Sequence, residues 1–201
     1  MNSGRSVRRA AMWAAAVLLL SCGGHNTFHL DVCNCLPTAP ESEDFRHSAK
    51  HVPLPNTPAQ DITVATMLSW PQTPVPPDGA PRSGRELQMF HLAHVFVQLT
   101  YENQTDCDIH VEISDTADKT APRAIVETPS DGEYCSARQS FQAQLQAHGI
   151  TLGVSLDQGE LPQAFPADVV GLAFEDLPHK RGSAQVQTIW EIHPAIVQLT
   201  K

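Results

Sequence analysis

The sequence lacks the motifs that announce several large classes of enzyme and nucleic-acid-binding protein. Its 201 residues contain no Gly-rich phosphate-binding loop, no Gly-x-Ser-x-Gly elbow and no His-Glu-x-x-His helix. Basic residues are also few, with 13 Lys and Arg against 22 Asp and Glu. Because nucleic-acid affinity depends largely on basic side chains that neutralise phosphates, we expect no nucleic-acid partner.

Acidic residues are missing altogether from the first 21 positions. Three arginines there precede an uncharged apolar run over 10–20, a layout typical of an export signal and too short to span a bilayer as a mature helix. The run ends in Leu-Leu-Ser-Cys, which resembles the lipobox of bacterial lipoproteins. This resemblance implies cleavage of residues 1–21 and attachment of lipid to Cys22. The alternative is an ordinary cleaved signal that leaves Cys22 near a terminus.

Removal of the signal would leave 180 residues with ten basic and 22 acidic side chains. We expect this acidic chain in the cell envelope, held at a membrane by its lipid and facing the periplasm or the exterior. Four further cysteines would meet an oxidising compartment, so disulfides are favoured over metal thiolates. The favoured pair is Cys107 with Cys135, which flank predicted strands and a helix; the alternative pairs either of them with Cys33 or Cys35.

Proline divides the mature chain into two parts. Ten of the 16 prolines fall between Pro37 and Pro81, and proline removes a backbone donor and disfavours packed regular structure. We therefore interpret 22–60 as the lipidated cysteine and a flexible tether, and 61–82 as a linker with a short helix that begins at Asp61 and ends before Pro71. Residues 83–201 are expected to form the folded domain.

The folded part alternates apolar and polar residues with the period of β-strands. A helical stripe ending near Gly149 separates the third strand from the fourth. Three strands, a helix and two strands is the order of the five-stranded OB-fold barrel. Another small barrel or an α+β sheet remains the alternative. The predicted strands are 91–101, 108–114, 123–128, 169–174 and 188–199, and the helix is 134–148.

Carboxylates and imidazoles are concentrated in and beside these strands. Asp108 and His110 are two residues apart and share a strand face, as do Glu191 and His193 before Pro194. Such groups can bind a divalent metal or act as an acid–base pair. Two other interpretations remain open: a solvated strand face, including Asp106 and Glu112, or a structural hydrogen-bond network. The candidate cluster is Asp108, His110, Glu127, His179, Glu191 and His193.

Five short segments in the same order resemble an uncharacterised family of exported bacterial proteins. The segments are Asp106-Cys107-Asp108-Ile109-His110, Ile125-Val126-Glu127-Thr128-Pro129, Ala137-Arg138, Val170 to His179, and Glu191-Ile192-His193-Pro194. Together they cover roughly residues 62–199. The chain departs from the family pattern at Ile192, where leucine is usual, and around Ala173 and Glu175-Asp176. The resemblance implies a shared small β-domain and brings no activity with it.

These observations lead to two hypotheses for function. The first is a membrane-tethered binding or interaction module without a cofactor, whose partner is a protein or a small molecule. The second is a metal-assisted hydrolase in which the candidate cluster holds an ion that activates water. Whether the cluster residues meet at one place separates the two.

Overall fold

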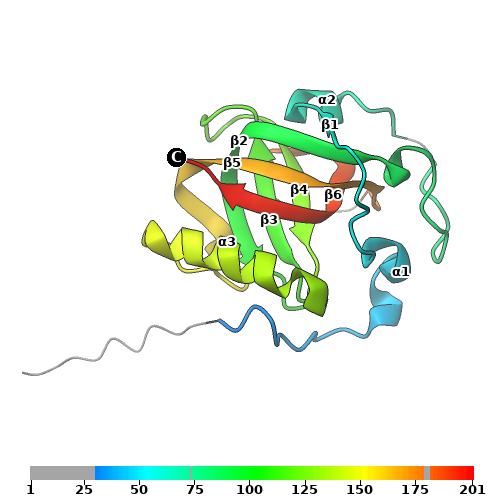
Figure 1. Cartoon of the computed structure of the whole chain (residues 1–201), viewed down its shortest axis with the longest axis horizontal. Helices are drawn as coiled ribbons and strands as arrows, with labels where there is room; N and C mark the ends of the chain where they lie inside the picture. The colour runs from blue at the N-terminus through cyan, green and yellow to red at the C-terminus, as the bar shows by residue number, and fades with distance from the viewer. Residues whose placement is uncertain (1–29, 73, 179–181) are drawn as a thin grey trace, which may run out of the picture.

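Five strands form a closed barrel in the computed structural model, which describes residues 30–72, 74–178 and 182–201 (Figure 1). β2, β3 and β4 pair antiparallel in sequence order, β4 pairs in parallel with β6, and β5 pairs antiparallel with both β6 and β2. Helix α3 separates β4 from β5. This is the strand order of an OB-like barrel, so the predicted fold class is confirmed.

The barrel strands are β2 (Met89–Glu102), β3 (Ile109–Ser114), β4 (Arg123–Thr128), β5 (Glu160–Glu175) and β6 (Val186–Leu199). The other elements are η1 (Glu41–Glu43), α1 (His47–Lys50), β1 (Gln60–Asp61), α2 (Val64–Leu68), η2 (Gly84–Leu87), η3 (Gly132–Tyr134), α3 (Cys135–Ala147) and α4 (Leu156–Gly159).

The barrel interior is apolar because alternate residues of each strand point inward. In β3 the inward residues are Ile109, Val111 and Ile113, all fully buried in the core cluster. Phe141 and Leu145 of α3 join the same core. Truncating such a leucine costs about 2–5 kcal/mol, so α3 stabilises the barrel as well as connecting two strands.

Residues 30–60, here called the N-terminal segment, pack against the barrel and are joined to it by two disulfides. The bonds are Cys33–Cys135 and Cys35–Cys107. The predicted Cys107–Cys135 disulfide is therefore wrong, because each of these cysteines faces the N-terminal segment. The expected flexible tether is also wrong for residues 30–60, in which Val32 is buried and α1 packs near the barrel (Figure 1).

Two elements, α2 and β5, differ from the sequence prediction by more than two residues at one end. Helix α2 is shorter than expected and starts after Thr63, whose hydroxyl accepts the Thr66 N–H, while Asp61 belongs to β1. Strand β5 begins at Glu160 rather than at position 169. The first half of β5 was not predicted because it contains Pro162 and Pro166, and proline is disfavoured within strands.

Among the residues that the structure describes, none of the helices has the length and apolarity needed to cross a membrane.

Candidate functional site

Five residues of the candidate cluster lie together on the outer face of the barrel. His110 belongs to β3, Glu127 to β4, and Glu191 and His193 to β6, while Asp108 directly precedes β3. Strand alternation turns them away from the apolar interior. We call this set the barrel-face cluster.

The N-terminal segment and nearby loops cover this face, so its side chains are buried. Asp108, Glu112 and His193 are at most 1% exposed, and the interpretation of Asp108 and Glu112 as a solvated face is wrong. Asp106 lies at the same end of β3 and lines a cavity.

Glu127 joins the two histidines of the barrel-face cluster. One of its carboxylate oxygens lies 2.8 Å from His110 Nδ1 and the other lies 3.1 Å from His193 Nδ1. Glu191 Oε1 lies 3.3 Å from the same His193 nitrogen. His110 and His193 therefore share one neighbourhood.

The other ring nitrogen of His193 has no hydrogen-bond partner. His193 Nε2 is buried and lies at an ion-pair distance of 3.2 Å from Asp108 Oδ2, without making a hydrogen bond to the described residues. The other oxygen of this carboxylate, Asp108 Oδ1, accepts a hydrogen bond from the backbone N–H of Ser130. A buried polar atom without a partner is unusual in a folded protein.

Two predicted residues cannot be placed: Cys22 and His179 lie outside the described residues. The structure therefore leaves the lipid attachment and the role of His179 as predictions.

The N-terminal segment adds a second group of imidazoles and carboxylates that the sequence analysis missed. His51 Nδ1 lies 2.7 Å from Asp131 Oδ2, and His51 Nε2 lies 3.8 Å from Asp108 Oδ2 and 3.6 Å from Asp44 Oδ2. His47 stacks on His51 with ring centroids 3.9 Å apart. The spacing Asp-x-x-His-x-x-x-His at 44–51 was the available signal, since positions three and four apart share a helix face.

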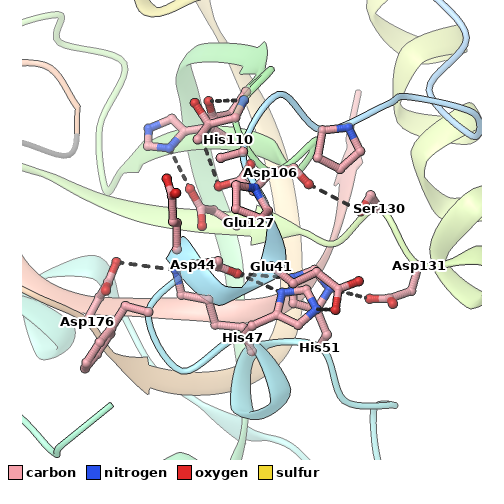
Figure 2. A pocket seen from close by; sticks show the side chains of 18 of the residues that line it. Glu41, Asp44, His47, His51, Asp106, His110, Glu127, Ser130, Asp131 and Asp176 are labelled. Atoms are coloured by element: carbon pink, nitrogen blue, oxygen red, sulfur yellow. Dashed lines mark hydrogen bonds and ion pairs between the residues drawn. The ribbon is translucent and has the colours of Figure 1, made fainter. Parts of the chain in front are cut away.

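A cavity of about 450 Å³ lies between the two groups. Figure 2 shows Asp106, His110 and Glu127 on one side of it and Asp44, His47 and His51 on the other. Asp131 reaches His51, and Asp176 lies near Lys50 at 3.8 Å between Oδ2 and Nζ. We call this cavity the acidic pocket.

Ionisation at the site follows from burial and from the many carboxylates. Burial alone would lower the pKa of His193, but Asp108 and Glu127 raise it to about 9. Burial raises the pKa of Asp106, and the charges of Asp108 and Glu127 add to this, giving about 7. Burial acts against the charged form of Glu127 as well, yet His110 and His193 hold its pKa well below the usual range.

Three sets of side chains bring possible metal-donor atoms within 4.8 Å of one another. They are Asp44 with His47 and His51, His51 with Asp108 and His193, and Glu127 with Glu191 and His193. Imidazole nitrogens and carboxylate oxygens are ligands that zinc accepts. The same groups can also exchange protons, so the geometry allows cation binding and acid–base chemistry.

A scan against protein-family models and searches of curated proteins and of solved structures found no match to this chain.

Proposed function

We propose that this chain is an exported, lipid-anchored binding protein whose barrel captures a small cation in the acidic pocket. The observation that supports this proposal most directly is the charge of the pocket lining. Among the described residues, seven carboxylates line the pocket together with one lysine and three histidines. The carboxylates are Glu41, Glu43, Asp44, Asp106, Glu127, Asp131 and Asp176.

The lining of the acidic pocket keeps a net negative charge even in the protonation state that adds most positive charge. With Asp106 protonated and all three histidines charged, the remaining carboxylates still outnumber the cationic groups. A partly enclosed cavity with one sign of charge concentrates ions of the opposite sign, because its walls have a low dielectric constant. A cationic ligand is therefore favoured over an anionic one.

Cation binding can be tested by titrating the purified protein in detergent with putrescine, calcium, zinc and citrate at fixed ionic strength. We expect at least one cationic probe to bind in the pocket and citrate not to bind. Replacing the rim carboxylates (Glu41→Gln, Glu43→Gln) should weaken binding by about fivefold or less per charge. Asp157→Asn removes an exposed carboxylate outside the pocket and serves as the control. Preferential binding of citrate, or no binding of any probe, would contradict the proposal.

Lipid attachment is supported by the Leu-Leu-Ser-Cys run at the end of the uncharged apolar segment. Wild-type protein should incorporate labelled fatty acid in cells, and Cys22→Ala should not. Equal labelling of both would end this part of the proposal.

Metal-assisted hydrolysis is the second candidate, favoured by the donor sets beside a cavity. It requires a bound ion that activates water. Hydrolysis of an activated ester that stops on chelation and returns with metal would support it. A rate that is indifferent to chelation would exclude the metal-assisted mechanism.

A further inference from the structure

We propose that His51, Asp108 and His193 bind one zinc ion at the inner wall of the acidic pocket. This inference rests on the proposed cation binding and names the cation and its ligands. A second groove, lined by Pro53, Pro81 and Leu87, has no indicated occupant.

Two separations among the three donor atoms are close to those in a zinc site, and all three atoms lie within 4.8 Å of one another. Asp108 Oδ2 lies 3.2 Å from His193 Nε2 and 3.8 Å from His51 Nε2. Ligands of a tetrahedral zinc at 2.0–2.1 Å are about 3.3–3.4 Å apart. Side-chain shifts that bring the three atoms to these separations would let them hold an ion.

Each histidine is oriented by a carboxylate on its far nitrogen. Asp131 lies 2.7 Å from His51 Nδ1, and Glu127 and Glu191 lie 3.1 and 3.3 Å from His193 Nδ1. A carboxylate that accepts the Nδ1 proton fixes the tautomer in which Nε2 has a lone pair, and such pairs accompany most metal-bound histidines.

The two Nε2 atoms are buried, and neither makes a hydrogen bond to the described residues; the carboxylate oxygens near them lie 3.2 Å from His193 and 3.6 and 3.8 Å from His51. The side chains of His51, Asp108 and His193 are 6, 2 and 0% exposed. A purely structural network would be expected to satisfy these atoms, because an unpaired buried polar group is costly. Coordination gives both nitrogens a partner at once. The Nε2–zinc bonds form with the imidazole lone pairs, and any proton on Nε2 leaves for solvent.

The donor types select zinc over the abundant hard cations. Calcium and magnesium prefer sets made of oxygen, whereas two imidazoles and one carboxylate suit zinc. His51 also lines the pocket, so the ion is reached from it. Asp44 lies on that side, but its two oxygens already face His47 and Lys50 at 3.0 and 3.1 Å. Water or a ligand therefore takes the fourth position.

Zinc binding is tested by calorimetric titration of the chelator-treated protein, followed by cobalt substitution and absorption spectroscopy. We expect one zinc per chain, retained in a hundredfold excess of calcium, and the visible bands of tetrahedral cobalt. His51→Gln and His193→Gln should each weaken zinc binding by at least about 100-fold, and Asp131→Asn by about 10- to 100-fold.

His91→Gln is the matched control, because His91 Nδ1 also lies 2.8 Å from a carboxylate, Asp61, but this pair is far more exposed. Its zinc affinity should equal that of the wild type. His193 is fully buried, so circular dichroism must show that His193→Gln is folded; His51→Gln gives an independent reading from the N-terminal segment.

Three results would overturn the zinc site. Loss of binding in His47→Gln but not in His193→Gln would move the ion to Asp44, His47 and His51. Binding of putrescine without binding of zinc would refute the zinc site and leave the proposed cation binding intact. Failure of every cation to bind would refute both.

Discussion

Two groups of buried carboxylates in this protein differ in the cationic side chain that they face. Three of them face buried arginines: Glu86 with Arg46 at 2.7 Å, Glu102 with Arg138 at 3.0 Å, and Glu112 with Arg123 at 3.0 Å between oxygen and nitrogen. In the barrel-face cluster, by contrast, the carboxylates of Asp108, Glu127 and Glu191 face imidazoles.

The two groups differ in whether the arginine or histidine side chain can bind anything besides its carboxylate. A guanidinium stays charged at all ordinary pH values, has five N–H donors and offers no lone pair, so an arginine–carboxylate pair has only a structural role here. An imidazole whose Nδ1 is held by a carboxylate keeps a second nitrogen that can bind a proton or a metal. The arginine pairs therefore hold the fold, and the imidazole set can take a ligand.

Loss of an arginine that faces the first group should have the largest effect on stability. Arg138 is fully buried and donates to Glu102 and to the carbonyl oxygens of Val32, Thr128 and Cys107. Arg138→Met leaves the Glu102 carboxylate buried without its cation. We expect the free energy of unfolding in urea to fall by about 3–5 kcal/mol.

The double variant Arg138→Met with Glu102→Gln tests the cause of this loss. It should recover part of the stability, because the unpaired buried charge is gone. A double variant as unstable as the single one would show that the lost contacts to carbonyl oxygens dominate.

Loss of a disulfide should have the next largest effect on stability. It should also weaken zinc binding, so it affects both the fold and the imidazole set. The bonds join residues 102 and 72 positions apart, and they hold the N-terminal segment that contains His51 against the barrel. Replacing Cys33 and Cys135 by serine should lower the free energy of unfolding by roughly 2–5 kcal/mol. Zinc affinity should fall as well, since His51 is less restrained. Unchanged zinc affinity in a destabilised variant would show that the segment needs no disulfide to place His51.

The smallest expected effect on the free energy of unfolding is that of Glu112→Gln, and it should depend on pH. Burial would raise the pKa of Glu112, but the His110 imidazole 3.8 Å away and hydrogen bonds from Ser183 and Arg123 lower it to about 2. Because the folded pKa lies below the unfolded value of 4.5, the stabilisation is complete above pH 4.5 and is lost as the pH falls toward 2. Glu112→Gln should be about 1–3 kcal/mol less stable than the wild type at pH 5.5. The two should converge near pH 2 in urea melts, and a constant difference would contradict the charged pairing.

Much of the barrel could be predicted from local patterns. Alternation in β3 and β6 and the helical stripe of α3 depend on neighbours along the chain, so the order of strands and helix was accessible and the OB-like fold is confirmed. The start of β5 could not be predicted, because Pro162 and Pro166 interrupt its alternating pattern. Its pairing with β2 arises only when the barrel closes.

Only half of the candidate site could be predicted from the sequence. Asp108 and His110, and Glu191 and His193, share strand faces and could be paired from their spacing. His51 was not assigned, because the proline-rich composition of its segment indicated a tether, whereas disulfides and long-range hydrogen bonds hold that segment against the barrel. The two cysteines at 33 and 35 were the remaining indication, since a segment with two disulfide partners elsewhere is not free.

Zinc-edge X-ray absorption of the protein loaded with one equivalent of zinc is the most direct test of the zinc site. We expect a first shell of two imidazole nitrogens and two oxygens near 2.0–2.1 Å, with no sulfur. His193→Gln should lose one imidazole contribution or lose the ion. A shell made only of oxygen, or a wild-type spectrum that His193→Gln and His51→Gln leave unchanged, would contradict the assignment of the barrel-face imidazoles as ligands.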